Sequence, residues 1–157
     1  TMSADRRLRK ELLNLLCDPP AGLRIDEDSV GKDIRNWLIN VSGAAGTLFE
    51  SETFILKLSF TSEYPFDAPS VVFIGPNIPE HPHIYSNDAP SVVFIGPNIP
   101  EHPHIYSNGH ICLSMLYDDW SPAFSIEAIC VSIVSMLSSC KEKGRPPDDS
   151  SYVSRCP

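Results

Sequence analysis

The chain has 157 residues, of which 42% are hydrophobic and 20% charged, a balance typical of a globular domain with a hydrophobic core. The formal net charge of -8 at pH 7 argues against nucleic acid or an anionic membrane as a partner. No apolar run reaches the roughly 18 residues of a membrane span, and the charged N-terminal segment predicts no secretory signal. Five cysteines without a Cys-x-x-Cys pair favour a reduced protein of the cytoplasm or nucleus over a disulfide-bonded secreted one.

Residues 3–18 predict an amphipathic helix, which Ser3 caps and Pro19-Pro20 ends. Its apolar stripe consists of Leu8, Leu12, Leu15 and Leu16. Antiparallel strands follow, because apolar and polar residues then alternate with a period of two. The buried faces of the first two strands consist of Trp37, Ile39 and Val41, and of Phe54, Leu56, Leu58 and Phe60. A proline-rich turn, YPFDAP, leads to a further short strand, SVVFIG.

A second helix begins after Ser125, and its composition predicts burial against the sheet. Its stripe consists of Ile126, Ile129, Ile133, Met136 and Leu137, widened by Val131 and Val134. Residues 140–152 predict a polar loop. A helix, an antiparallel meander, a long irregular segment and a buried helix together predict an α+β fold, in a single domain over residues 1–157.

The stretch DAPSVVFIGPNIPEHPHIYSN occurs twice without a substitution, as Asp67–Asn87 and Asp88–Asn108. Solenoids need about three or more diverged copies, so this pair indicates a recent or artificial duplication. We favour a cloning, gene-model or assembly artefact, which an intact mass one copy below 17.4 kDa would confirm. If both copies are real, only one SVVFIG can fill the strand position, and the spare strand predicts dimers or aggregates.

Two kinds of chemistry fit the segment HPHIYSNGHICL. Zinc is one, since His102, His104, His110 and Cys112 are all possible ligands, although their spacing is unusual and no second cysteine pair follows. Nucleophilic catalysis by Cys112 is the interpretation that we favour. This cysteine follows the polar turn Asn108-Gly109-His110, and a thiolate forms thioesters readily.

The remaining cysteines are interpreted differently. Cys130 and Cys17 lie in helical contexts and are interpreted as small, buried apolar residues.

Motifs over nearly the whole chain, apart from one copy of the repeat, resemble the ubiquitin-conjugating enzymes. In family order they are DPP, GAAGTLFE, YPFDAPSVVF, HPH with NGHICL, and WSPAFSI. HPH, GHICL and SMLSSCKEK followed by RPPD are most similar to the W-type branch, whose members attach ubiquitin to protein N-termini. The resemblance implies the ubiquitin-conjugating fold, a four-stranded antiparallel sheet backed by helices, and no metal or organic cofactor. The implied partners are ubiquitin, a ubiquitin-activating enzyme, a RING or U-box ligase and a protein substrate.

The resemblance also implies the catalytic residues. Cys112 is the thioester nucleophile, and His104 stands where most of the family has an oxyanion-supporting Asn. Asn108, in the turn before Cys112, is included in the predicted catalytic set. Asp149, or its neighbour Asp148, matches the acidic residue that orients or deprotonates the amine; solvated loop charge is the alternative for both.

His104 favours an N-terminal amine as the acceptor. An α-amino group has a pKa of about 7.7 to 8.0 against about 10.4 for lysine, so its free-base fraction at neutral pH is roughly a few hundred-fold larger. A site without the usual Asn loses more with lysine than with an α-amine. A zinc-binding or ligase-binding module without transfer activity is the alternative function.

Two partner surfaces follow from the resemblance. The activating enzyme is expected to meet Arg6, Arg7, Arg9 and Lys10, for which a solvated helix face is the alternative. A ligase is expected to meet Phe66, Ser121, Pro122 and Ala123, with core packing as the alternative for Phe66. A copy that loops out from Asp67 would disturb this surface. The family usually continues beyond Pro157, so residues 152–157 are expected to fray and Cys156 to be an exposed thiol.

Overall fold

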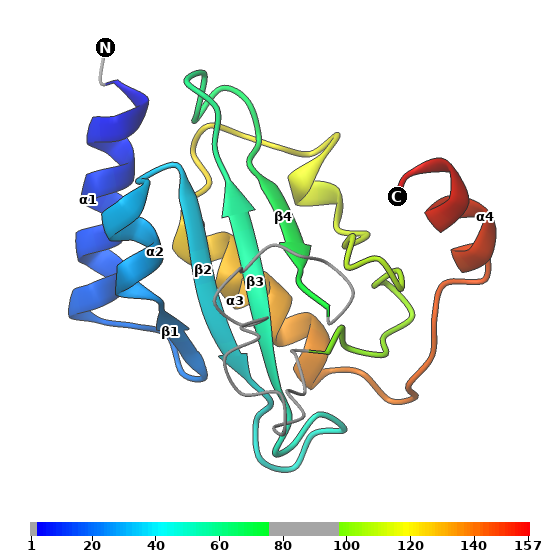
Figure 1. Ribbon diagram of the computed structural model, residues 1–157. Coiled ribbons are helices and arrows are strands. Elements are labelled where there is room, and N and C mark those ends of the chain that lie inside the picture. Colours follow the sequence, from blue (N-terminus) through cyan, green and yellow to red (C-terminus); the bar gives the residue numbers. More distant parts are fainter. Residues whose placement is uncertain (1–2, 76–97) are drawn as a thin grey trace, which may run out of the picture.

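The computed structural model describes residues 3–75 and 98–157. Its sheet is an antiparallel meander of four strands in the order β1-β2-β3-β4, flanked by helices (Figure 1), and this confirms the predicted α+β fold. The elements are α1 Ala4–Cys17, β1 Leu23–Ile25, α2 Glu27–Lys32, β2 Asn36–Ser42, β3 Thr53–Ser59, β4 Ser70–Phe73, the 3-10 turn η2 Ser114–Leu116, α3 Ile126–Ser138 and α4 Asp149–Arg155. Within the described ranges, no helix is long and apolar enough to cross a membrane.

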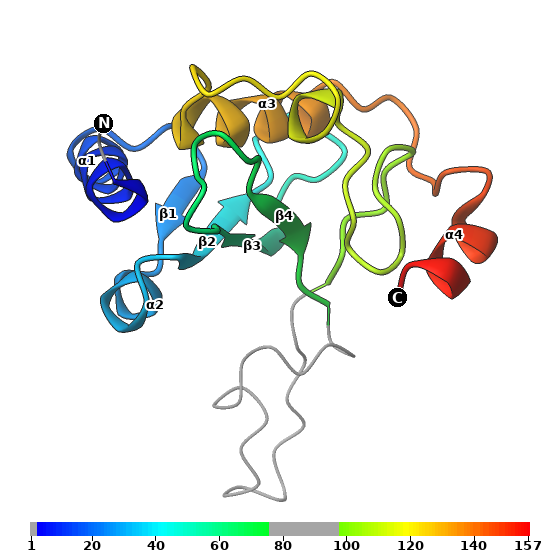
Figure 2. The ribbon, with the colours of Figure 1, turned by 90° about the horizontal axis from the view of Figure 1, so that it is seen from above.

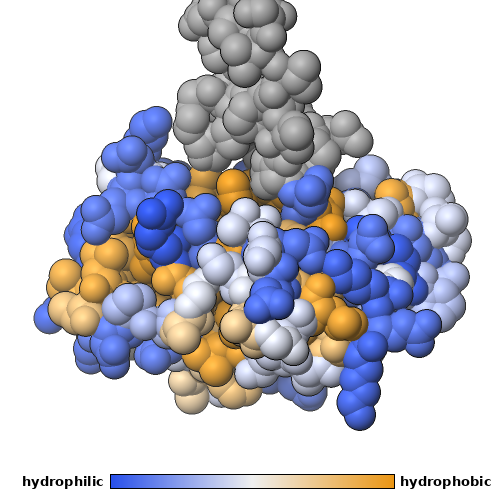
Figure 3. Space-filling view, turned by 90° about the horizontal axis from the view of Figure 1, so that it is seen from below, coloured by the Kyte–Doolittle hydropathy of each residue, from blue (hydrophilic) through white to orange (hydrophobic). Residues whose placement is uncertain are grey.

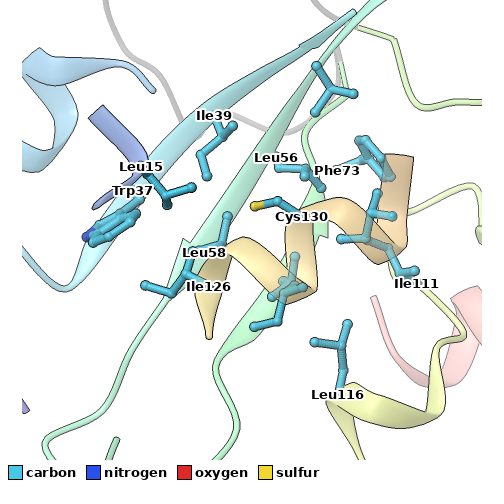
Figure 4. Close-up of a cluster of buried hydrophobic side chains, with 14 of the residues drawn as sticks. Leu15, Trp37, Ile39, Leu56, Leu58, Phe73, Ile111, Leu116, Ile126 and Cys130 are labelled. Carbon is cyan, nitrogen blue, oxygen red and sulfur yellow. The ribbon is translucent and has the colours of Figure 1, made fainter. Parts of the chain in front are cut away.

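The core lies between one face of the sheet and α3, which crosses that face (Figure 2). Alternation along β2 and β3 gives each strand one buried side, as the sequence predicts. In Figure 4, Cys130 of α3 points toward Leu56 and Leu58 of β3. Burial raises the pKa of the Cys130 thiol to about 12, so this cysteine is a core residue, as predicted.

Side-chain caps begin both long helices where the sequence predicts them. Ser3 Oγ accepts from the Arg6 amide at 3.3 Å, and Ser125 Oγ accepts from the Ala128 amide at 3.0 Å. Three predictions of burial are wrong. Val131 is exposed because it points away from the sheet-facing stripe of α3. Leu16 and Cys17 are exposed because they lie on the solvent side of the last turn of α1.

The strand β4 comes from the first copy of the repeat, and the segment before Cys112 comes from the second. Residues 67–75 of the first copy form the turn and β4, so the chain does not loop out from Asp67, the condition under which the ligase surface was expected to be disturbed. The HPH motif beside Cys112 is that of the second copy, His102–His104, as predicted. The spare SVVFIG, at 91–96, lies outside the described residues.

Beyond α3 the chain is more ordered than the sequence predicts. The sequence predicts a polar loop over residues 140–152, which is correct as far as residue 148 and wrong beyond it, because α4 begins at Asp149. The prediction that residues 152–157 fray is wrong as far as Arg155, where α4 ends. The residue pattern located neither β1 nor α2. In Figure 1, α4 (red) lies beside the segment that precedes Cys112 and far from α1.

Apolar side chains on the surface are interspersed with hydrophilic ones. Figure 3 shows this mixture on the face seen from below, the side on which the β2–β3 connection and the C-terminal end of α1 lie in Figure 1. Exposed Leu48 and Leu16 belong to these two segments. Single exposed apolar residues of this kind are ordinary in globular proteins.

Candidate functional site

Cys112 lies on the surface in a segment that the core holds on both sides. Ile111 before it and Leu116 after it are buried, while the Cys112 side chain is exposed. The Cys112 amide donates to the His104 carbonyl oxygen at 2.8 Å, which ties the cysteine to the HPH motif. The fold therefore presents the thiol to solvent on a backbone that is fixed by packing and hydrogen bonding.

The turn before Cys112 requires glycine at its tightest point. Gly109 has φ +92°, and a Cβ there would lie 1.9 Å from the carbonyl oxygen of Phe73 on β4. Asn108 supports the same turn, since its Oδ1 accepts from the His110 amide at 3.1 Å. The Asn-Gly pair thus sets the course of the chain toward Cys112.

The two histidines of the HPH motif differ sharply. His102 is only 4% exposed; its Nδ1 accepts from the His104 amide at 2.9 Å, so its Nε2 carries the proton donated to the Met136 carbonyl of α3 at 3.1 Å. Burial lowers the pKa of His102. His104 is exposed, and within residues 3–75 and 98–157 its ring makes no hydrogen bond. The buried first histidine, rather than the third residue of the motif, braces this loop.

This geometry does not favour the zinc alternative. Both ring nitrogens of His102 are engaged in hydrogen bonds, so neither has a lone pair free for a metal. Across the described part of the chain, no group of three or more His, Cys, Asp or Glu side chains could hold a metal ion.

Helix α4 contacts the turn before Cys112 through a set of polar and aromatic contacts that we call the α4 cluster. Its residues are Tyr106, Ser107, Asn108 and His110 on the turn, and Asp148, Asp149, Tyr152 and Cys156 at α4. The rings of Tyr106 and Tyr152 stack with centroids 3.8 Å apart. The Tyr152 hydroxyl lies 2.9 Å from His110 Nδ1. These contacts bring the C-terminal helix to the catalytic segment.

The predicted acidic residues belong to this cluster. Asp149 Oδ1 accepts from the Ser107 amide at 2.8 Å, and the Asp148 carboxylate accepts from the Tyr106 hydroxyl at 3.2 Å. Asn108 Nδ2 donates to the Cys156 carbonyl oxygen at 2.5 Å. Each of these three side chains therefore holds α4 and the turn together, whatever else it does in a reaction.

The predicted ligase surface is a pair of adjacent loops. Phe66 is 68% exposed, which excludes the alternative of core packing for it. The Trp120 indole donates to the Pro65 carbonyl at 2.8 Å, so Phe66 lies beside the loop that contains Ser121, Pro122 and Ala123. Pro122 and Ala123 are exposed and Ser121 is half-buried.

The basic residues of α1 do not all face solvent. Arg6, Arg9 and Lys10 are exposed, whereas Arg7 is half-buried. The Arg7 guanidinium donates to the carbonyl oxygens of Pro122 at 2.9 Å and Phe124 at 3.1 Å. Arg7 therefore joins the two predicted partner surfaces from inside the molecule.

The family model for ubiquitin-conjugating enzyme matches residues 7–154. The chain belongs to the ubiquitin-conjugating enzymes. It is 51% identical over 154 residues to the probable ubiquitin-conjugating enzyme E2 W-A of Danio rerio, covering 98% of this chain and 88% of the relative. It is 47% identical to the ubiquitin-conjugating enzyme E2 W of Caenorhabditis elegans, with the same coverage.

Solved structures agree with the sequence comparison. The structure of the ubiquitin-conjugating enzyme E2 UbcA1 from Agrocybe aegerita matches with a TM-score of 0.80 and 35% identity, covering 98% of this chain and 95% of that one. This ubiquitin-conjugating enzyme is thus a transferase that forms a thioester with ubiquitin on a cysteine. Its family works with ubiquitin, a ubiquitin-activating enzyme and ubiquitin ligases.

Sequence reasoning missed Tyr106, His110 and Tyr152 as site residues of this ubiquitin-conjugating enzyme. His110 was considered only as a zinc ligand, and Tyr152 was placed in a loop. A helix-start pattern was present, since Pro146-Pro147 precedes Asp148 and Asp149, and Arg155 lies in the last turn. That pattern could have indicated α4, but not the turn that α4 contacts.

Proposed function

We propose that this chain is a W-type ubiquitin-conjugating enzyme that uses Cys112 to pass ubiquitin to the N-terminal α-amino group of a protein. The Cys112 thiolate attacks the activated C-terminal carbonyl of ubiquitin, and the activating enzyme's thiol leaves. The acceptor amine then attacks the thioester, an amide bond forms, and the Cys112 sulfur leaves. The exposed thiol on a fixed backbone supports this role.

The single observation that carries the α-amine preference is the exposed His104 at the third position of the motif. Residue 104 is histidine, so the motif has no side-chain amide at the position where the family usually has asparagine, and the ring of His102 braces the loop instead. A site with weaker oxyanion support favours the amine that is already free at neutral pH. Asn108 and Asp149 are proposed to hold the turn and α4 while the amine approaches.

The partner surfaces are proposed on the same basis. Arg6, Arg9 and Lys10 are free to meet the activating enzyme, and Phe66, Pro122 and Ala123 a RING or U-box ligase. Arg7 is proposed to support both surfaces through its bonds to Pro122 and Phe124 rather than to bind a partner directly.

The decisive experiment combines charging with discharge. With activating enzyme, ATP and ubiquitin, a thiol-sensitive adduct is expected on the wild-type chain and not on Cys112→Ala. The charged enzyme should then discharge onto a peptide whose only amine is its N-terminus and leave free lysine largely unused at pH 7. Efficient discharge to lysine would contradict the α-amine preference, and no adduct would favour a ligase-binding module without transfer.

His104→Asn gives a matched test of the same idea. Restoring the side-chain amide is expected to raise lysine discharge relative to α-amine discharge, because an amide N–H can support the oxyanion. An unchanged ratio of the two rates would show that His104 does not set the preference.

A further inference from the structure

Tyr152 and His110 form a hydrogen-bonded pair beside Cys112. The Tyr152 hydroxyl lies 2.9 Å from His110 Nδ1, and the two rings meet edge to face with centroids 5.7 Å apart. The stack on Tyr106 holds the Tyr152 ring from its other side. The position of the hydroxyl is therefore set by two aromatic contacts and one hydrogen bond.

The pair lies on the same side of the chain as the Cys112 thiol. His110 and Cys112 flank the buried Ile111 in an extended segment, where side chains two residues apart share a face. Burial raises the pKa of Tyr152, and the charges of Cys156, Cys112 and Asp148 raise it further against the opposing charge of Arg155. The phenol is thus near the place where an attacking amine must lose a proton.

We propose that Tyr152 and His110 form the proton acceptor for the amine that attacks the Cys112 thioester, with Tyr152 in contact with the amine and His110 acting through it. This inference rests on the proposed function and names residues for its transfer step. The neutral His110 ring accepts at Nδ1 from the Tyr152 hydroxyl, which leaves the phenol oxygen free to accept from the amine.

The proton transfers balance. Attack of the amine on the thioester carbonyl gives a tetrahedral adduct with a positively charged nitrogen. That nitrogen gives a proton to the Tyr152 oxygen while the Tyr152 proton moves to His110 Nδ1. The C–S bond then breaks, its electron pair goes to Cys112 sulfur, the carbonyl re-forms, and the proton on His110 returns through Tyr152 to the thiolate. No oxidant, metal or further reactant is needed.

The surroundings keep His110 in the form that the transfer requires. Burial lowers the pKa of His110, so its ring is neutral at pH 7 and can accept a proton. Its ring faces the Tyr152 hydroxyl, and the charged or titratable groups that act on that hydroxyl are Cys156, Cys112, Asp148 and Arg155.

Single-turnover discharge of the purified Cys112–ubiquitin thioester onto an N-terminal peptide amine tests the pair. Tyr152→Phe keeps the aromatic stack and loses only the hydroxyl, and His110→Gln removes the titrating ring. Each is expected to lower the discharge rate constant at saturating peptide by about 100-fold, with the half-saturating peptide concentration little changed. Because the two residues act as one unit, the double variant should be no slower than either single variant.

Tyr106→Phe is the matched control, because it also loses one hydroxyl from the same stack but leaves His110 untouched. Its discharge should slow less than that of Tyr152→Phe and should keep the wild-type dependence on pH. Divided by the concentration of unprotonated peptide amine at each pH, the wild-type rate should fall once the pH drops below the pKa of His110, which burial lowers from the ordinary value of about 6.5. The rate of His110→Gln should show no such fall. Wild-type rates for Tyr152→Phe, or equal losses for Tyr106→Phe and Tyr152→Phe without a change in pH profile, would overturn the proposal.

Prior charging of every variant separates this test from that of the proposed function. If the wild-type chain forms no thioester, the proposed function is wrong, and so is the role of Tyr152 and His110 in discharging that thioester. If every variant charges and only discharge of Tyr152→Phe and His110→Gln slows, the proposal stands.

Discussion

Two clusters join distant parts of this chain, and they differ in burial. The Glu11 cluster connects α1, the turn after β3 and the start of α3, and consists of Arg7, Glu11, Tyr64 and the backbone amide of Ile126. Glu11 is 8% exposed and Tyr64 2%. The α4 cluster connects α4 to the turn before Cys112, and α4 has no buried residue. The carboxylate of the Glu11 cluster is buried, whereas the α4 cluster lies at the surface.

Because the two clusters differ in burial, we expect them to contribute differently to stability and to activity. A buried carboxylate that accepts three hydrogen bonds cannot lose a partner without leaving buried donors unsatisfied. Exposed contacts are replaced by water at little cost, so loss of the α4 cluster should change the free energy of unfolding only slightly. The Glu11 cluster therefore stabilises the frame that carries the partner surfaces, and the α4 cluster shapes the site.

The largest expected effect is that of Glu11→Ala. This substitution leaves the Tyr64 hydroxyl and the Ile126 amide without their acceptor, at 2.5 Å and 2.8 Å in the structure. We expect a loss of about 4 kcal/mol in the free energy of unfolding, measured by denaturant titration. Tyr64→Phe, which removes one donor and leaves Glu11 its others, should lose less than half as much. Equal losses, or none, would show that the buried cluster is not a unit.

Gly109→Ala is expected to have the next largest effect, since Gly109 is the tightest position in the turn that α4 contacts. Alanine disfavours φ +92°, and its Cβ would meet the Phe73 carbonyl oxygen. We expect a loss of about 3 kcal/mol in unfolding free energy and slower charging, because the turn that leads to Cys112 must shift. Gly46→Ala is the control, because φ is +79° there but no atom lies within 4 Å of the added Cβ. If both variants lose the same stability, contact with β4 plays no part.

The main helices and strands could be predicted from the sequence, because periodicity and helix capping depend on residues that are close together in the chain. Period-two alternation gave the faces of β2 and β3, and Ser3 and Ser125 marked where α1 and α3 begin. Cys112 could be selected because its neighbours form a turn. The Glu11 cluster could not be predicted, because a glutamate in an amphipathic helix has the pattern of a solvent-exposed residue, and burial depends on Tyr64, 53 residues away.

The α4 cluster escaped prediction for a related reason. Tyr152 lies in a short segment without an apolar stripe, and its position depends on stacking with Tyr106 rather than on burial. Arg7 illustrates the same limit on the other side of the molecule, since a run of basic residues does not tell which one turns inward. Contacts between distant polar residues leave no periodic pattern in a sequence.

A smaller effect is expected from the titration of His102, which is buried like Glu11 but lies close to the site. Its pKa is lowered in the folded state, so the unfolded chain binds the proton more readily. Its contribution to stability is therefore present above pH 6.5 and is lost as the pH falls below that value, by at most about 1.4 kcal/mol per pH unit. In His102→Gln, the free energy of unfolding, measured by denaturant titration from pH 7.5 to 5.5, should depend less on pH than in the wild type. His104→Gln, at an exposed position, should keep most of this pH dependence, because His104 lowers the pKa of His102 less than burial does. An equal change in both variants would contradict the assignment.

The smallest effect on stability is expected from Tyr152→Ala, which opens the α4 cluster by removing both the stack on Tyr106 and the bond to His110. Because α4 buries no residue, we expect a loss of about 1 kcal/mol or less in the free energy of unfolding. Protection of the α4 amides from hydrogen exchange should fall to that of a frayed terminus, while the amides of β2 and β3 keep theirs. Discharge of ubiquitin from Cys112 should nevertheless slow. Tyr152→Ala would then lose much activity and little stability, whereas Glu11→Ala should lose much stability. A stability loss near that of Glu11→Ala would mean that α4 belongs to the frame, and the distinction between the two clusters would then fail.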